Sequence, residues 1–273
     1  MEISTISLDG GKLVVNSEYA ELLRCNGINA ADKLWSLHGT TVKKVLKERG
    51  TERLMLTSID YSGMIETFIK RFTFPPLKEK LKAALSMKFK TFNALDEWNA
   101  IVSFHKHELP TMTPLAAARI GSKTCVLTLG INEYVRASEL FENFTEADLA
   151  RKRALIEKIA RLAGGMHAVN MAHQDFYLVH MFVREEEDDK VYLIDLQRVM
   201  IQRKLSVRWR VKDLAQLYFS ARPFVSQTDI LRFWKIYTGM CGVELYEDSK
   251  LIVKIFRKAE KIRLHTEKKY RKK

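Results

Sequence analysis

The chain has 273 residues, 47% of them hydrophobic, so it can bury a sizeable core and is not an extended disordered protein. No segment reaches the roughly 20 apolar residues of a membrane-spanning helix, and the N-terminus lacks the basic start and apolar stretch of a secretory signal. Three well-separated cysteines exclude a disulfide framework and a CxxC zinc site. We therefore expect a globular, cytoplasmic protein with reduced thiols.

The formal net charge is +13, which indicates an anionic partner. Much of it lies in two segments. Residues 254–273 hold ten basic and two acidic residues, and residues 198–212 hold six basic residues and no acidic one. Nucleic acid, anionic lipid and phosphorylated sugar all fit such surfaces, and charge alone does not choose among them.

Between Val42 and Phe74 three short β-like runs are separated by the turn-forming segments ERG and DYSG. They predict a three-stranded antiparallel meander. Because strand side chains alternate between two faces, Phe68, Lys70 and Phe72 share one face of the third strand. A lysine is thus expected among aromatic side chains.

After two consecutive prolines the sequence becomes helical. Asn93 is a suitable N-cap for a helix that carries apolar residues at helical spacing and Glu97 in its first turn. The run CVLTLG then predicts a buried strand, followed by a polar connector that ends at Arg136. A boundary between two lobes is expected in this region.

A second helix is expected to begin at a capping box, Thr145 to Asp148, and to continue through Met166. A loop, two short strands on either side of EEEDD and a helical remainder follow. Strands first and helices later predict an α+β chain of two lobes. We assign residues 1–129 to an N-lobe with an antiparallel sheet and the Glu97 helix, and residues 130–273 to a mainly helical C-lobe.

Residues with kinase-like chemistry occur in a recognisable order: a strand lysine, a helix glutamate, an HxD loop and an aspartate at a strand end. Phosphoryl transfer mainly requires positioned charges. Lys70 would hold the ATP phosphates, and Glu97 would keep that lysine charged. Asp175 of the loop would accept the proton of the substrate hydroxyl, and Asp195 would bind Mg²⁺ through oxygen.

Each of these residues, taken alone, also has a purely structural explanation. Lys70 could protect the edge of a sheet from aggregation, and Glu97 could complement the positive end of its helix. His173 could be a hydrogen-bonded core histidine, and Asp195 could begin a turn. The kinase interpretation rests on their order and spacing together.

The segments HQDFYLVHMFV, VYLIDLQR and VRWRVKDLAQLYFS resemble the lipopolysaccharide core heptose kinase family, which also includes Kdo kinases. The resemblance extends over about residues 42–233. It implies a bilobal protein-kinase-like fold, ATP and Mg²⁺ as cofactors, and a core heptose hydroxyl as acceptor. It matches Lys70, Glu97, Asp175 and Asp195 to the family's functional positions. It also makes Asp213 the buried aspartate that, with His173, supports the catalytic loop.

The sequence departs from the general protein-kinase pattern at several positions. Gln174 replaces the arginine of HRD, so control by a phosphorylated activation loop is not indicated. His180 stands where protein kinases place asparagine, and imidazole is a poorer Mg²⁺ ligand than oxygen, which weakens the case for a second metal site. Asp195-Leu-Gln lacks the glycine of Asp-Phe-Gly, and the turn at Gly50 has one glycine where a phosphate-binding loop has several.

Two basic features are candidates for binding the acceptor or the membrane. The first consists of Arg198, Arg203, Arg208 and Arg210, which would attract an anionic lipopolysaccharide core glycolipid. The second is the C-terminal helix, whose apolar residues at helical spacing could lie on an anionic inner-membrane surface or pack against the protein. These residues are Leu251, Ile255, Ala259 and Ile262.

We therefore predict a cytoplasmic sugar kinase that works at the inner membrane, where it could be held peripherally, and we expect no nucleic-acid partner. Three alternatives remain open. The acceptor could be Kdo, a small molecule or a protein. The chain could be a pseudokinase, or it could be a basic nucleic-acid-binding module, although it lacks the motifs of such modules.

Overall fold

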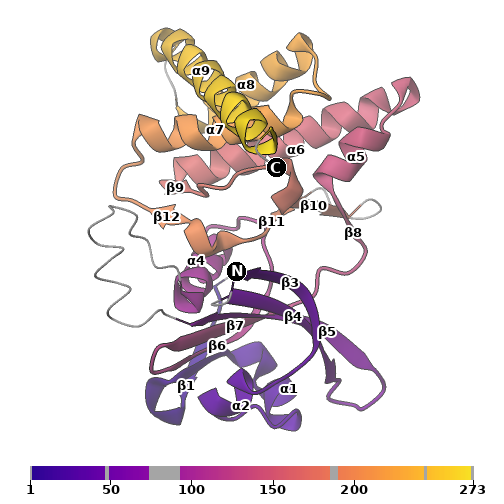
Figure 1. Ribbon diagram of the computed structural model, residues 1–273, viewed down its shortest axis with the longest axis vertical. Coiled ribbons are helices and arrows are strands. Elements are labelled where there is room, and N and C mark those ends of the chain that lie inside the picture. Colours follow the sequence, from indigo (N-terminus) through magenta and orange to yellow (C-terminus); the bar gives the residue numbers. More distant parts are fainter. Residues whose placement is uncertain (1, 47–48, 74–92, 185–189, 243–244, 272–273) are drawn as a thin grey trace. The chain divides into compact units, whose positions relative to one another are not determined.

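The computed structural model describes residues 2–46, 49–73, 93–184, 190–242 and 245–271 (Figure 1). The helical segment expected just after the two prolines, and the EEEDD turn, lie outside these residues. The chain divides into two compact units, Met1–Asn132 and Glu133–Lys273. Each unit is described by itself below.

The N-terminal unit is built on a seven-stranded sheet of order β1-β2-β6-β7-β5-β4-β3 (Figure 1). All neighbouring strands are antiparallel. The predicted meander is confirmed as β3, β4 and β5, and the CVLTLG strand is confirmed as β7. The strands are β1 (Thr5–Leu8), β2 (Leu13–Asn16), β3 (Thr40–Leu46), β4 (Arg49–Thr57), β5 (Met64–Thr73), β6 (Pro114–Ile120) and β7 (Lys123–Leu129).

Helices cover both faces of this sheet. Two short helices, α1 (Ala20–Cys25) and α2 (Ala31–Trp35), bury one face together with the larger apolar core, which includes Leu23, Ile69 and Leu127. The longer helix α4 (Ala94–Lys106) packs on β5, β6 and β7 from the other face, around Phe72 and Trp98. Two 3-10 turns, η1 (Asp9–Gly11) and η2 (Ser17–Tyr19), connect the first elements.

Helix α4 begins where the sequence predicted. The side chain of Asn93 accepts hydrogen bonds from the amides of Leu95 and Asp96, and the Asp96 carboxylate accepts one from the Asn93 amide. The Ala94 amide donates to Thr124 Oγ1 of β7 at 3.1 Å. The start of α4 is thereby fixed to the sheet, which sets the position of Glu97.

The C-terminal unit is mainly helical and confirms the predicted α+β class. Helix α6 packs against α8, and α7 packs against α9. Its helices are α5 (Ala137–Asn143), α6 (Leu149–Ala168), α7 (Val207–Ala221), α8 (Gln227–Cys241) and α9 (Leu245–Tyr270), with 3-10 turns η3 (Glu146–Asp148), η4 (Leu178–His180) and η5 (Leu196–Arg198).

Short strands carry the loops of this unit. The two strands predicted on either side of EEEDD are β10 (Met181–Arg184) and β11 (Val191–Leu193), which pair antiparallel. The polar connector expected up to Arg136 contains the short strand β8 (Tyr134–Arg136), which pairs with β10. Strands β9 (Met171–Ala172) and β12 (Met200–Ile201) pair with each other.

The last helix packs against the protein through its apolar residues. Leu251, Ile255 and Ala259 are at most 6% exposed, and α9 lies along α7. The ring of Phe256 contacts the ring of Tyr218 on α7, with centroids 4.8 Å apart and the ring planes tilted by 60°. The apolar face of α9 could have lain on a membrane or packed against the protein, and the structure favours packing. The basic side chains form the exposed face.

Candidate active site

Lys70 lies in the middle of the sheet of the N-terminal unit. It is on β5, which pairs with β4 on one side and with β7 on the other. The edge-protection explanation is therefore wrong. The Nζ atom of Lys70 lies 2.6 Å from Oε1 of Glu97 on α4. The Lys70 side chain is 16% exposed and the Glu97 side chain 2%. Because Glu97 is buried, the ion pair with Lys70 is what makes its charge tolerable there.

Lys70→Met is expected to destabilise the protein by about 3 to 5 kcal/mol, because it removes the Lys70 cation that pairs with the buried Glu97 carboxylate. The double variant Lys70→Met with Glu97→Gln should recover most of that loss, since no buried charge remains. Denaturant unfolding of the four proteins measures the coupling. Additive effects of the two substitutions would contradict this account of the pair.

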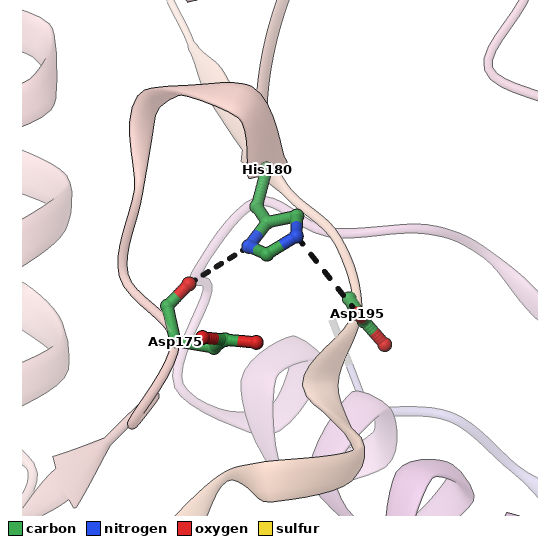
Figure 2. Close-up of side chains that lie close together, drawn as sticks. All are labelled: Asp175, His180 and Asp195. Atoms are coloured by element: carbon green, nitrogen blue, oxygen red, sulfur yellow. Dashed lines mark hydrogen bonds and ion pairs between the residues drawn. The ribbon is translucent and has the colours of Figure 1, made fainter. Parts of the chain in front are cut away.

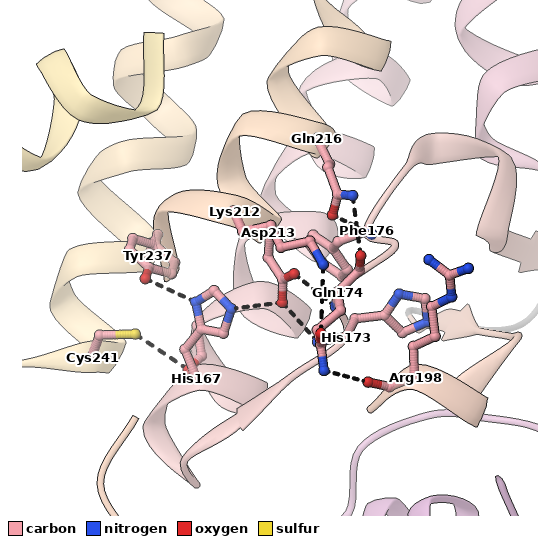
Figure 3. A network of polar contacts seen from close by, with 11 residues as sticks. His167, His173, Gln174, Phe176, Arg198, Lys212, Asp213, Gln216, Tyr237 and Cys241 are labelled. Atoms are coloured by element: carbon pink, nitrogen blue, oxygen red, sulfur yellow. Dashed lines mark hydrogen bonds and ion pairs between the residues drawn. The ribbon is translucent and has the colours of Figure 1, made fainter. Parts of the chain in front are cut away.

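The HxD loop of the C-terminal unit is held by helix α7 (Figure 3). Asp213 is fully buried. Its Oδ2 accepts a hydrogen bond from the His173 amide at 2.7 Å, and its Oδ1 accepts one from the Gln174 amide at 2.8 Å. Gln174 has a φ of 68°, in the left-handed region. Two charge-assisted bonds thus support a backbone conformation that a non-glycine residue seldom adopts.

Two further residues of α7 hold the same loop, and the sequence analysis missed them. Gln216 accepts a hydrogen bond from the Phe176 amide and donates one to the Gln174 carbonyl, both at 3.1 Å. Ser220 Oγ accepts from the Leu178 amide at 3.1 Å. With Asp213 they occupy positions i, i+3 and i+7, one face of a helix. That spacing of polar residues in DLAQLYFS was the signal available in the sequence.

Asp213 is supported in turn from α6 and α8. His167 Nε2 lies 3.3 Å from Asp213 Oδ2, and its Nδ1 lies 2.9 Å from the Tyr237 hydroxyl. A carboxylate can only accept, so Nε2 donates to it, and Nδ1 lies beside the Tyr237 hydroxyl and its proton. Burial raises the pKa of Tyr237, which keeps that proton in place. Figure 3 shows this continuous chain of contacts.

His173 connects the loop to the strand end that carries Asp195. Its Nε2 donates to the Ile194 carbonyl at 3.0 Å, while the Ile194 amide donates to the His180 carbonyl at 3.0 Å. Burial lowers the pKa of His173, so the ring remains neutral. Ile194, the residue just before Asp195, is therefore held through its carbonyl by His173 and through its amide by His180.

Asp175, His180 and Asp195 come together in the C-terminal unit (Figure 2). One ligand atom from each lies within 4.8 Å of the other two, and all three residues are partly buried. Asp195 lies between β11 and η5, as the residue immediately before η5, and has a φ of 64°. Two carboxylates and an imidazole at this spacing are able to hold one divalent cation.

Gln174 also contacts the segment that follows Asp195. Its Nε2 donates to the Arg198 carbonyl at 2.7 Å, and Lys212 Nζ lies 3.5 Å from its Oε1. In a protein kinase the arginine at this position pairs with a phosphorylated loop. Here a neutral amide bonds to the backbone instead, which requires no modification.

The four candidate acceptor-binding arginines differ in exposure. Arg203 and Arg208 are exposed, whereas Arg198 and Arg210 are partly buried. Arg208 lies over the ring of Trp209 at 5.0 Å. Of the four arginines, Arg203 and Arg208 are therefore the two that present an exposed cation to an anionic ligand.

The C-terminal unit also contains an apolar cavity of about 520 Å³. It lies among α5, α6, α7, α8 and α9, and Phe141, Ile156, Leu217, Ile230, Phe233 and Phe256 contribute to its lining. The sequence analysis did not predict it. Within the described ranges, no helix combines the length and apolarity needed to cross a bilayer.

Comparison with known proteins was made against family models, curated proteins and solved structures. Residues 32–237 match the lipopolysaccharide kinase (Kdo/WaaP) family. The chain is 30% identical over 265 residues to the lipopolysaccharide core heptose(I) kinase WaaP of Pseudomonas aeruginosa, covering 92% of this chain and 96% of that protein. It is 30% identical over 266 residues to the enzyme of the same name from Escherichia coli K12, covering 89% and 94%.

Among solved structures, the chain is similar to one described as WaaP in complex with acyl carrier protein. The TM-score is 0.70 at 28% identity, and the match covers 91% of this chain and 98% of that one. The similarity in sequence and in structure therefore extends over nearly the whole length of both proteins.

Proposed function

Because the chain belongs to the lipopolysaccharide kinase (Kdo/WaaP) family, we propose that it transfers the γ-phosphate of ATP to a heptose hydroxyl of the lipopolysaccharide inner core. The main observation behind this proposal is that Asp175 and Asp195 lie close together, where their carboxylates could bind a cation. In the transfer, the heptose oxygen bonds to the γ-phosphorus, the bond to the ADP oxygen breaks, and the hydroxyl proton passes to the Asp175 carboxylate.

The other residues position and stabilise the reactants. Lys70, held by Glu97, would bind the α- and β-phosphates. Asp195 would hold a Mg²⁺ ion, for which its carboxylate is a suitable ligand, and His180 is the neighbouring donor. When bound, the metal would neutralise part of the negative charge on the phosphates. Asp213 and His173 would keep the loop of Asp175 in register with the strand end of Asp195.

The acceptor is a polyanion, and the exposed residues Arg203 and Arg208 would contact it. We further propose that the protein works at the cytoplasmic face of the inner membrane. The exposed basic side chains of α9, such as Lys254, Lys258 and Lys261, would be attracted to anionic lipid there. The apolar side of α9 is already packed against α7, so this association would be electrostatic and weakened by salt.

The direct test uses γ-labelled ATP, Mg²⁺ and two purified acceptors, a core glycolipid with heptose and a truncated one that ends before it. Label is expected in the heptose-containing glycolipid alone. Label in the truncated acceptor would indicate the Kdo sugar as substrate. Equal label in an added protein acceptor would contradict the sugar-kinase proposal.

We also propose that an acyl carrier protein binds this chain, as in the structurally similar complex. The apolar cavity of the C-terminal unit is large enough to receive part of an acyl chain. Burial of each methylene group contributes about 0.8 kcal/mol, so a few methylenes decide the affinity.

Val225→Trp, which fills part of the cavity lining, is expected to weaken binding of acylated carrier protein about tenfold, the effect of losing roughly two methylene contacts. Val253→Trp on the exposed side of α9 serves as the matched control and should bind normally. Affinities for acylated and unacylated carrier protein can be measured by calorimetry. Equal affinity for the two forms would contradict the cavity as the acyl site.

A further inference from the structure

The position of the proton on His180 follows from its hydrogen bond. Nδ1 of His180 lies 2.7 Å from the backbone carbonyl oxygen of Asp175 (Figure 2). A carbonyl oxygen can only accept a hydrogen bond, so Nδ1 carries the proton. In the neutral imidazole the other nitrogen, Nε2, then has a free lone pair.

That lone pair is on the side of the ring that faces Asp195. Nε2 lies 3.9 Å from Asp195 Oδ2, which is too far for a hydrogen bond. Two ligands bound at about 2.1 Å to one octahedral ion lie roughly 3 to 4 Å apart, so this separation suits two ligands of a shared cation. Asp175 contributes a carboxylate oxygen to the same cluster, in which the ligand atoms of the three residues lie within 4.8 Å of one another.

The backbone around His180 fixes the ring in this orientation. The His180 amide donates to the Tyr177 carbonyl at 3.0 Å, and its carbonyl accepts from the Ile194 amide at 3.0 Å. The Tyr177 amide bonds to the Asp175 carbonyl, the same oxygen that receives the His180 ring proton. A histidine whose other nitrogen donates to a backbone carbonyl is the usual arrangement of a metal-binding histidine.

We propose that His180 Nε2 is a metal ligand, and that this nitrogen shifts the metal preference of the site from Mg²⁺ toward transition-metal ions such as Mn²⁺ and Co²⁺. The proposal rests on the proposed kinase function and concerns the same site. Mg²⁺ favours oxygen donors, whereas imidazole nitrogen is accepted more readily by first-row transition metals. The presence of histidine, where protein kinases have asparagine, is then a determinant of metal choice.

The test uses the full chain with Mn²⁺ and a non-hydrolysable ATP analogue. Pulsed electron paramagnetic resonance detects nitrogen nuclei bonded to Mn²⁺. An imidazole nitrogen coupling is expected in the wild-type protein and should be lost in His180→Asn, which offers an oxygen donor instead. The matched control His265→Asn, at an exposed histidine of α9, should retain it.

Titration of Mn²⁺ and Mg²⁺ into the same proteins gives a second readout. The preference for Mn²⁺ over Mg²⁺, expressed as the ratio of dissociation constants, is expected to fall about tenfold in His180→Asn. Nucleotide-dependent Mn²⁺ binding without a nitrogen coupling would overturn the inference, while heptose phosphorylation by the same preparation would leave the proposed function standing. Absence of both metal binding and phosphate transfer would overturn both.

Discussion

Asp175→Asn is expected to reduce phosphate transfer about a thousandfold, because the amide cannot accept the proton that the heptose hydroxyl loses. The affinity for ATP should change little, since the residue proposed to hold the phosphates is Lys70. Transfer to core glycolipid is measured under single-turnover conditions, and nucleotide binding by calorimetry. Rapid turnover by Asp175→Asn would remove the proposed role of this residue.

The structure gives a reason to expect that this variant folds normally. Asp175 contacts its own loop through its backbone carbonyl, which accepts from His180 Nδ1 at 2.7 Å and from the Tyr177 amide at 3.0 Å. An asparagine keeps that carbonyl. A loss of activity can therefore be separated from a loss of structure by comparing unfolding curves. Glu142→Gln, an exposed carboxyl group on α5, is the matched control and should behave as wild type.

Elements with strong local signals could be predicted from the sequence. The meander of β3, β4 and β5 follows from β-branched and aromatic runs separated by turn residues, and the start of α4 follows from the Asn93 capping box. The strand β6 was missed because PLAAARI is rich in alanine, which favours helices when considered alone. Its alanines are buried between two neighbouring strands, a tertiary environment that overrides local preference.

In the candidate site, too, some residues could be predicted from the sequence and others could not. Lys70, Glu97, Asp175 and Asp195 could be proposed because a kinase needs those charges in that order along the chain. His167 and Tyr237 could not, because they contribute through contacts that span 46 and 70 residues of sequence. A buried histidine and a buried tyrosine on amphipathic helices are indistinguishable from ordinary core residues until the helices are packed.

The support of the HxD loop by α7 leads to the second large expected effect. Asp213→Ala is expected to lower the free energy of unfolding by about 3 to 5 kcal/mol, mainly through lost hydrogen bonds. It leaves the buried amides of His173 and Gln174 without acceptors, at about 1 to 3 kcal/mol for each group. It also removes the acceptor of His167 Nε2. The midpoint of thermal unfolding should fall by roughly 6 to 15 °C, and phosphate transfer should fall with it because the loop of Asp175 loses its conformation.

His167→Gln distinguishes support of the loop from simple loss of packing. This variant disturbs the contacts to Asp213 and Tyr237 but leaves both loop amides bonded to the Asp213 carboxylate. We expect it to lower stability as well, yet to retain most of the wild-type turnover at a temperature where it is folded. Asp213→Ala, assayed at a temperature where it too is folded, should remain slow. If the two variants lost activity only in proportion to their unfolded fraction, Asp213 would serve core stability alone. A kinetic defect specific to Asp213→Ala would instead tie the left-handed conformation at Gln174, and thus the direction of the Asp175 carboxylate, to the two bonds that α7 supplies.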